Sequence, residues 1–257
     1  MNNLAASRVR LDSPANAPAR QIADLIRKRL EALSDSEAAA HAQRFFKTGL
    51  GDYGEGDLFR GIRVPVLRKL SISLDDAPLA QVIRLLESEF HEDRLLALLM
   101  LMRRFLRGNE PERALIFDLY LSNTRYINNW DLVDVSAEHI VGRFLRNIPR
   151  APLYKLAMSE SLWARRIAIV ATFHFIRQGE FMDTFALAEL LLYDREELIH
   201  KAAGWMLREI GKRCSEKILL DFLKKNYHAL PRTTLRYAIE KFPPAKRARL
   251  LAGNFSG

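Results

Sequence analysis

Residues 78–106, PLAQVIRLLESEFHEDRLLALLMLMRRFL, decide the fold class of this chain. Pro78 stands where a helix commonly has its first turn, and two runs rich in apolar residues, residues 78–90 and 92–106, follow one directly after the other. Both runs have the length of a helix, and only a short break separates them. The stretch therefore predicts a pair of consecutive helices.

The same pattern continues along the chain, while strand-like alternation of apolar and polar residues is scarce. Such pairs recur at intervals of about forty residues, as they do in HEAT-type arrays. The sequence therefore predicts an all-α fold, an α-α superhelix of irregular HEAT-like helical repeats that form a curved solenoid, with a concave face suited to a long partner. The further helical runs are residues 21–33, 111–121, 130–145, 161–176, 185–193, 196–212, 216–227 and 232–242.

We expect a flexible N-terminal tail over residues 1–19 and a single domain over residues 20–257, because no Pro/Gly/Ser-rich linker interrupts the second range. The N-terminal segment has no apolar core like that of a secretory signal. No apolar run approaches the ~20 residues that span a bilayer. A lone cysteine, Cys214, suits a reducing compartment. These features predict a cytoplasmic monomer that does not contact membranes.

The positive charge of the chain is concentrated near its C-terminus. Residues 201–257 hold 13 Lys and Arg against 4 Asp and Glu, which accounts for the whole formal charge of +9. A basic surface that meets a polyanion would produce this distribution. A solvated basic helix face explains the charge equally well.

Several kinds of catalytic chemistry lack their motifs in this sequence. There is no His-Glu-x-x-His, no cysteine pair, no EF-hand loop and no Gly-x-Ser-x-Gly, so we expect neither a metal nor another cofactor. The glycines of residues 47–65 follow no strand, lack a Gly-Lys-Ser/Thr ending and lie among acidic residues. We therefore expect a structured connector there rather than a phosphate-binding loop.

The helix that starts after Asn129, a good N-cap, presents an acid at an unusual position. Asp134 follows Trp130 by four residues and lies only about 40° from the apolar stripe, at the border of core and surface. Asp131 has a simpler role as a first-turn acid that the helix dipole favours. Taken alone, Asp134 would more often make a structural hydrogen bond. The buried stripe is expected to hold Val133, Ala137, Ile140, Val141 and Phe144.

The other two tryptophans also share helix faces with charged residues. Trp163 and Arg166 are three residues apart, whereas Arg165 points elsewhere. In the next long helix, Lys201, Trp205 and Arg208 follow the spacing i, i+4, i+7. An indole between two cations is a common way to contact a sugar–phosphate backbone, although a lone tryptophan is more often core. Gly204 in the same helix costs about 1 kcal/mol relative to Ala, so close approach of a neighbour or ligand is expected.

These motifs taken together resemble a known family. The segments NNWDLVD, LWARRIAIV and KAAGWMLRE, with FFKTGLGDYGEGD, GIRVP and PRTTLRYAIEKFP, resemble the DNA alkylation repair family of AlkD-like HEAT-like-repeat alkylpurine DNA glycosylases. The resemblance covers most of the chain from about residue 37 onward, and the order and spacing of the motifs make it specific.

The resemblance implies roles for individual residues. It implies that Trp130 and Trp205 flank the deoxyribose of a damaged nucleotide, that Asp134 is the catalytic carboxylate, and that Arg166 grips a phosphate nearby. Two positions depart from the family pattern: a tyrosine is replaced by Phe45, and a DNA-contacting lysine by His174. With Phe45 and His174, the predicted DNA-binding residues are Lys201, Arg208 and Trp163.

The predicted function is that of a monofunctional DNA-alkylpurine glycosylase. Its partner would be duplex DNA that contains purines made cationic by alkylation, such as 3-methyladenine or 7-methylguanine. One alternative is a HEAT-repeat protein that binds branched or damaged DNA without catalysis. A second is a helical-repeat protein scaffold, which predicts no affinity for DNA, whereas both DNA readings predict affinity that falls steeply with salt.

Overall fold

The computed structural model describes residues 17–255, with side chains from Ile22 onward, and its regular elements are helices. No strand occurs in this range; an isolated parallel bridge joins Leu58 to Phe90. The all-α class and the irregular α-α repeats expected from the sequence are confirmed. Most of the predicted tail, residues 1–16, lies outside the described residues, and α1 begins at Ala17.

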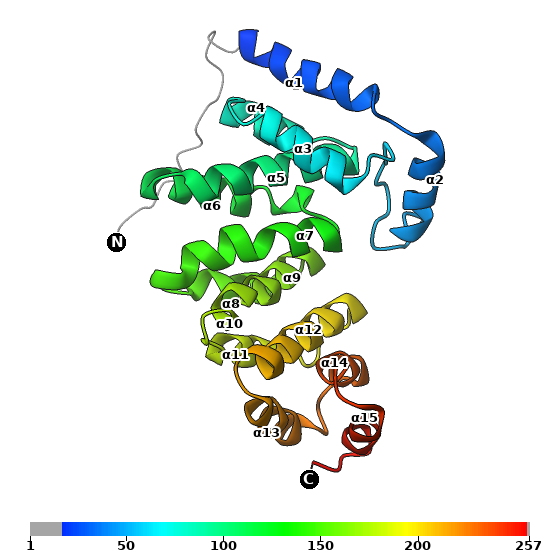
Figure 1. The fold of residues 1–257 in the computed structure, drawn as a ribbon, viewed down its shortest axis with the longest axis vertical. Coiled ribbons are helices and arrows are strands. Elements are labelled where there is room, and N and C mark those ends of the chain that lie inside the picture. Colours follow the sequence, from blue (N-terminus) through cyan, green and yellow to red (C-terminus); the bar gives the residue numbers. More distant parts are fainter. Residues whose placement is uncertain (1–16, 256–257) are drawn as a thin grey trace. The chain divides into compact units, whose positions relative to one another are not determined.

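The helices follow one another in short succession, as Figure 1 shows. In the N-terminal part they are α1 (Ala17–Glu31), α2 (Ser36–Phe45), α3 (Val64–Ser73), α4 (Leu79–Leu86), α5 (His91–Arg107) and α6 (Glu110–Ser122). The 3₁₀ turn η2 (Thr124–Tyr126) precedes α7 (Trp130–Ala137), which continues into the π-turn η3 (Glu138–Gly142) and the 3₁₀ turn η4 (Leu145–Asn147). The rest are α8 (Ala151–Ala157), α9 (Leu162–Ala171), α10 (Phe173–Ile176), α11 (Met182–Leu190), α12 (Glu197–Arg213), α13 (Glu216–Asn226), α14 (Arg232–Ala238) and α15 (Pro244–Leu251).

The helix starts follow from local sequence. Asn129 is the N-cap of α7, as predicted, and its side-chain oxygen accepts a hydrogen bond from the Trp130 backbone N–H at 2.8 Å. Ser161 and Ser215 cap α9 and α13, and each side-chain oxygen accepts a hydrogen bond from the backbone N–H three residues later. Pro78 stands one residue before α4. The predicted pair of helices is present, but the first helix ends at Leu86, four residues earlier than predicted, and the second begins at His91.

The chain divides into two compact units, the first ending at Met100 and the second beginning at Leu101, so the boundary falls inside α5. Of the predicted site residues, Phe45 belongs to the first unit and all others to the second. The single domain predicted over residues 20–257 stays a prediction.

In the first unit, a buried charge network holds the predicted connector in a fixed structure. The Glu92 carboxylate accepts three backbone N–H groups, from Arg60 at 2.8 Å, Gly61 at 2.7 Å and Ile62 at 3.2 Å. Arg94 donates to Asp57 at 2.7 Å, and both side chains are buried. The three backbone N–H groups and the Asp57 carboxylate thus have partners, which fixes the path of the connector.

In the second unit, α9 packs against α7 on one side and α12 on the other, and α12 packs against α14 (Figure 1). The packed faces carry fully buried side chains, among them Leu132, Ile167 and Ile199. Burial of each such side chain contributes about 1.5–3 kcal/mol. This core fixes α7, α9 and α12 relative to one another, and these helices carry most of the predicted site residues.

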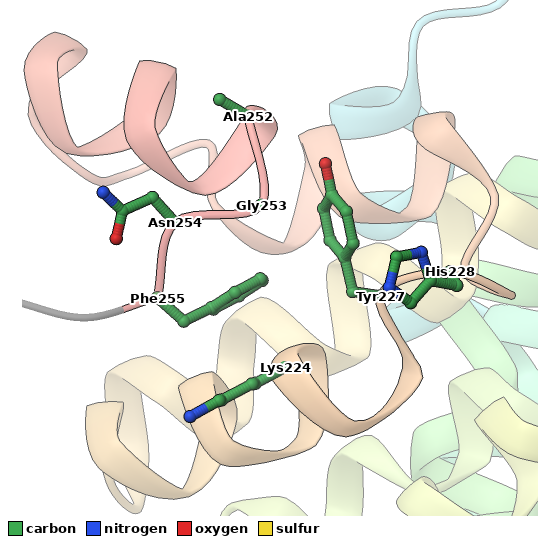
Figure 2. Close-up of a pocket in the computed structure, with 7 residues that line it drawn as sticks. All are labelled: Lys224, Tyr227, His228, Ala252, Gly253, Asn254 and Phe255. Atoms are coloured by element: carbon green, nitrogen blue, oxygen red, sulfur yellow. The ribbon is translucent and has the colours of Figure 1, made fainter.

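The last described residues fold back on α13 and line a hollow there (Figure 2). The Tyr227 hydroxyl donates to the Leu251 carbonyl at 2.9 Å, and the Phe255 ring meets the Tyr227 ring edge-on with centroids 5.5 Å apart. Gly253 has φ +81°, and a Cβ there would come within 2.9 Å of the Tyr227 ring. A glycine is therefore needed for this turn.

Candidate functional site

Asp134 lies in the middle of α7, one turn after Trp130. Its side chain is 21% exposed, so the carboxylate is neither sealed in the core nor freely solvated. The preceding helical residues Leu132 and Val133 are fully buried. The border position that the helical spacing predicts for Asp134 is thus confirmed.

Arg166 holds the Asp134 carboxylate with two hydrogen bonds. Its Nε donates to Oδ1 at 2.9 Å and its Nη2 donates to Oδ2 at 2.8 Å. The third nitrogen, Nη1, donates to the Leu198 carbonyl at the start of α12, at 2.6 Å. One guanidinium therefore links α7, α9 and α12, and the planar two-point contact fixes the orientation of the carboxylate.

Burial raises the pKa of Asp134 above its usual range, while the Arg166 guanidinium acts in the opposite sense. Asp131, one turn away on α7, adds a smaller repulsion that also raises the pKa. A carboxylate placed in such surroundings is poorly hydrated, so its charge interacts strongly with any cation that forms beside it.

A buried pair of hydroxyls lies behind this part of α7. The Tyr120 hydroxyl and the Ser136 Oγ are 2.8 Å apart, and Ser136 Oγ donates to the Leu132 carbonyl at 2.6 Å. Burial raises the pKa of Tyr120 far above its ordinary value. Tyr120 is therefore a neutral structural group that fixes α6 to α7.

The tryptophans differ in exposure. Trp130 and Trp205 are half-buried, and the Trp205 ring is tilted by 56° against Phe173 with centroids 5.8 Å apart. Trp163 is buried, with 9% of its surface exposed. Indole surface is thus available at Trp130 and Trp205, and much less of it at Trp163.

The predicted cations of α12 have acidic partners in this structure. Lys201 Nζ lies 2.9 Å from Glu197 Oε2, one turn earlier in the helix. Arg208 pairs with Glu240, which follows α14, and its Nη2 lies 3.6 Å from Glu209. The acidic partners are exposed, Glu197 by 64% and Glu240 by 42%, and ion pairs near the surface are worth about 0–1 kcal/mol, so a stronger anion can displace them.

Arg165 points away from Asp134, as the helical spacing predicts. Its Nε and Nη2 donate to the two carboxylate oxygens of Asp194 at 2.6 and 3.2 Å. The two adjacent arginines of α9 thus bind different aspartates. Arg165 binds Asp194, in the segment before α12, and Arg166 binds Asp134 of α7.

His174 is half-buried, and its surroundings keep it neutral. Burial and then the positive charges of Arg143 and Arg146 lower its pKa to about 4, with smaller effects from His139 and Arg177. His174 is therefore uncharged at neutral pH, at the position where the resemblance leads us to expect a lysine in the family. Phe45, in the first unit, is 58% exposed and meets Phe46 edge-on with ring centroids 5.0 Å apart.

Within residues 17–255, no group of three or more His, Cys, Asp or Glu side chains is arranged to hold a metal ion. No helix in the same range combines the length and the apolar character required to cross a membrane.

Sequence patterns miss some of the groups that shape this site. The Leu198 carbonyl and the Asp194 carboxylate bind arginines about 30 residues away, and such pairings have no local signal. The Glu197–Lys201 pair does have a local sequence signal, because an acid four residues before a lysine in a helix favours an ion pair.

Comparisons with known proteins agree with this architecture. The family model described as DNA alkylation repair enzyme matches residues 26–242. No curated protein matches the sequence. A predicted DNA alkylation repair enzyme from Enterococcus faecalis has a similar fold, with a TM-score of 0.63 at 17% sequence identity over 82% of this chain and 97% of that one. Because the family model covers most of its length, the chain belongs to the DNA alkylation repair enzyme family, and so to the proteins of DNA repair.

Proposed function

We propose that this protein is a DNA glycosylase that hydrolyses the N-glycosidic bond of cationic alkylated purines in duplex DNA. The observation that carries the proposal is the Asp134 carboxylate, oriented by Arg166 and still partly open to solvent. A carboxylate with a purely structural role would be expected to be sealed by its partners. We infer that the protein works in the cytosol or nucleoid, where its DNA substrate is found.

The leaving group in this reaction is already activated. Alkylation at N3 or N7 gives the purine a positive charge, and the electron pair of the breaking C1′–N9 bond neutralises it. The base therefore leaves without being protonated, so no general acid is needed. A single carboxylate can then suffice where most glycosidases use two.

Asp134 acts on the other product of bond cleavage, the sugar. Positive charge builds at C1′ and on the ring oxygen as the base leaves, and a fixed anion nearby stabilises it. The same carboxylate orients a water molecule that adds its oxygen to C1′, and it accepts the proton that this water loses. Because Arg166 already fixes the carboxylate, little reorganisation accompanies the reaction.

The remaining predicted residues would bind the substrate. The exposed indole surfaces of Trp130 and Trp205 would pack against the sugar and favour its developing cation. Lys201 and Arg208 would exchange their acidic partners for backbone phosphates. Arg166 uses three of its five N–H groups on Asp134 and Leu198, which leaves two for the predicted phosphate contact.

A second candidate function is recognition of branched or damaged DNA without catalysis. Two departures from the family pattern bear on how DNA is held and on the rate of catalysis: Phe45 lacks the hydroxyl of the family tyrosine, and His174 lacks the charge of the family lysine. Both changes concern DNA contacts rather than the carboxylate. We therefore place DNA recognition without catalysis second to the glycosylase function.

The deciding experiment compares Asp134→Asn with the wild-type protein on duplex DNA that contains 7-methylguanine or 3-methyladenine. The substitution keeps the shape and removes the charge, so base release should fall to the uncatalysed rate while duplex affinity changes by only a few-fold. Asp131→Asn, on the same helix, is the matched control and should retain base release. Excision at the wild-type rate by the Asp134→Asn protein would refute the assignment, and no release by the wild-type protein would favour the binding function.

A further inference from the structure

A cavity of about 640 Å³ opens in the second unit at the far end of the helix that carries Asp134. Its lining includes Arg113 of α6, Arg143 and Arg146 of the α7 extension, and His174 of α10. Glu110 is the acidic residue on this lining. With His174 neutral, the lining carries a net positive charge, and none of its arginines belongs to the Asp134 site.

The π-turn η3 brings Arg143 toward this cavity. Arg143 is nine residues after Asp134, which in a regular α-helix places it on the opposite face, about 180° away. A π-turn adds one residue to a helical turn. Arg143 therefore has the angular position that the eighth residue after Asp134 would have in a regular α-helix, roughly 80° from Asp134. By the same count, the two residues are separated by about 12 Å along the helix axis.

Gly142 allows α10 to approach closely at the same place. A Cβ on Gly142 would lie 2.1 Å from the Ala171 carbonyl oxygen and 2.9 Å from His174 Cβ. Only a residue without a side chain fits here, so the backbone of η3 packs directly on the α9–α10 junction. This contact places the His174 imidazole beside the Arg143 and Arg146 guanidinium groups, which is why they lower its pKa.

The arginines of the cavity differ in how firmly they are engaged. Arg113 is held by the end of α5, donating from Nε to the Phe105 carbonyl at 3.0 Å. Arg146 Nε lies 3.9 Å from Glu180, at the limit of an ion pair. The exposed Arg143 side chain makes no hydrogen bond or ion pair with any described residue. The cavity thus combines one fixed and two available guanidinium groups.

We propose that this cavity binds a phosphate group of the nucleic-acid backbone, as a second anchor about 12 Å along the helix from Asp134. Arginine forks suit phosphate because two N–H groups can bind two oxygens at once. The neutral His174 contributes one ring N–H donor, and the cavity has room for the sugars on either side of the phosphate. The choice of a backbone phosphate over a free one rests on the proposed function, which makes DNA the partner.

The first test uses inorganic phosphate and observes His174 directly. The proton–carbon NMR signals of the histidine rings are followed against pH with and without phosphate, and the His174→Gln protein identifies the signal. A bound anion stabilises the imidazolium, so the pKa of His174 should rise from about 4 as phosphate saturates the site. A His174 signal that phosphate does not shift would overturn the proposal.

The second test uses unmodified duplex DNA, so it does not depend on any glycosylase activity. Arg143→Gln should weaken duplex binding by about 5–10-fold at low salt and reduce the slope of log affinity against log salt by about 1. The matched control is Lys155→Gln, which removes one exposed positive charge from α8 and should change affinity less than about twofold. Equal effects of the two substitutions would overturn the proposal.

The two tests together distinguish the source of the phosphate and separate this site from catalysis. Duplex DNA should shift the His174 signal as inorganic phosphate does. A shift with inorganic phosphate and none with the duplex would overturn the backbone assignment in favour of a free phosphate. If both inorganic phosphate and duplex DNA shift the His174 signal but the protein releases no alkylated base, the phosphate site is supported and only the proposed glycosylase activity is refuted.

Discussion

Asp134 and Arg166 are 32 residues apart in sequence, yet two parallel hydrogen bonds of 2.9 and 2.8 Å join the carboxylate to the guanidinium. The guanidinium is almost fully buried, whereas the carboxylate keeps one-fifth of its surface exposed. This asymmetry suits an arrangement in which the arginine is the support and the carboxylate is the group offered to a ligand. Arg166 is thus a positioning residue for Asp134, whether or not it also contacts a phosphate.

The first prediction concerns the support. Arg166→Gln removes the charge that compensates Asp134 and leaves that carboxylate with a burial cost, so the free energy of unfolding should fall by about 3 kcal/mol. Base release should fall by at least tenfold because the carboxylate is no longer fixed. Urea unfolding followed by tryptophan fluorescence measures the first effect, since all three tryptophans lie in the second unit.

Arg165→Gln is the matched comparison, because Arg165 makes a similar two-point pair with Asp194 one residue earlier on α9. It should also lower stability, but base release per folded molecule should stay near that of the wild type. Equal losses of base release in the two variants would show that Arg166 acts through the stability of α9 and not through Asp134.

The second prediction concerns pH. Asp134 must be ionised to act, and its pKa is raised by burial, so base release should be present at neutral pH and be lost as the pH falls through that raised pKa. The midpoint should lie above the ordinary value of 3.8. In Arg166→Gln the effect that lowers the pKa is gone, so the midpoint should move to higher pH. Rates are measured after subtraction of uncatalysed base loss, and an unchanged midpoint in this variant would contradict the assignment.

Sequence periodicity predicts the fold class and the faces of single helices well. On the helix that begins at Trp130, Val133, Ala137, Ile140 and Val141 are fully buried, as the stripe requires. Phe144 is only half-buried, because the π-turn before it rotates the end of the helix, and its ring stacks on Phe117 with centroids 4.3 Å apart. A π-turn leaves no clear signal in composition or spacing, so this part could not be predicted.

The same distinction applies to the candidate site: spacings within one helix can be predicted from the sequence, and contacts between helices cannot. Trp130, Asp134 and the tryptophan–arginine spacings are visible in the sequence because a helix repeats every three to four residues. Which acid each arginine binds is not visible, because Arg166 meets Asp134 only after α9 packs on α7. The cavity around Arg143 was missed for a similar reason, since its residues come from separate helices.

The third prediction concerns the ion pair between Arg208 of α12 and Glu240, which lies two residues after the end of α14. Arg208 is paired with Glu240, and the pKa of Glu240 is lowered first by the hydrogen bond from Lys241 and then by the charge of Arg208. If Arg208 contacts phosphate, the acid competes with DNA for it. Arg208→Gln should then weaken duplex binding and reduce the salt slope by about 1, whereas Glu240→Gln should strengthen binding by about two- to fivefold. Fluorescence anisotropy with an unmodified duplex measures both, and a loss of affinity in the Glu240 variant would contradict the prediction.

The fourth prediction concerns Gly204, where helix propensity and packing act in opposite directions. Alanine is better than glycine in a helix by about 1 kcal/mol, so propensity alone predicts that Gly204→Ala is stabilising. In the structure, a Cβ there would lie 2.6 Å from the Thr234 carbonyl oxygen and 2.5 Å from Tyr237 Cβ, because α14 packs directly on this glycine. Relief requires a backbone shift, so Gly204→Ala should lower the free energy of unfolding by about 2–3 kcal/mol.

Gly211 is the matched control on the same helix. A Cβ there would also be crowded, at 2.5 Å, but by the Leu219 Cδ2 methyl, which can rotate away. The propensity gain then offsets most of the cost, so Gly211→Ala should change stability by less than about 1 kcal/mol. Urea unfolding of the two variants decides the matter. If Gly204→Ala is as stable as Gly211→Ala, α14 does not pack on α12 as closely as the structure has it, and the position of Glu240 beside Arg208 would have to be revised as well.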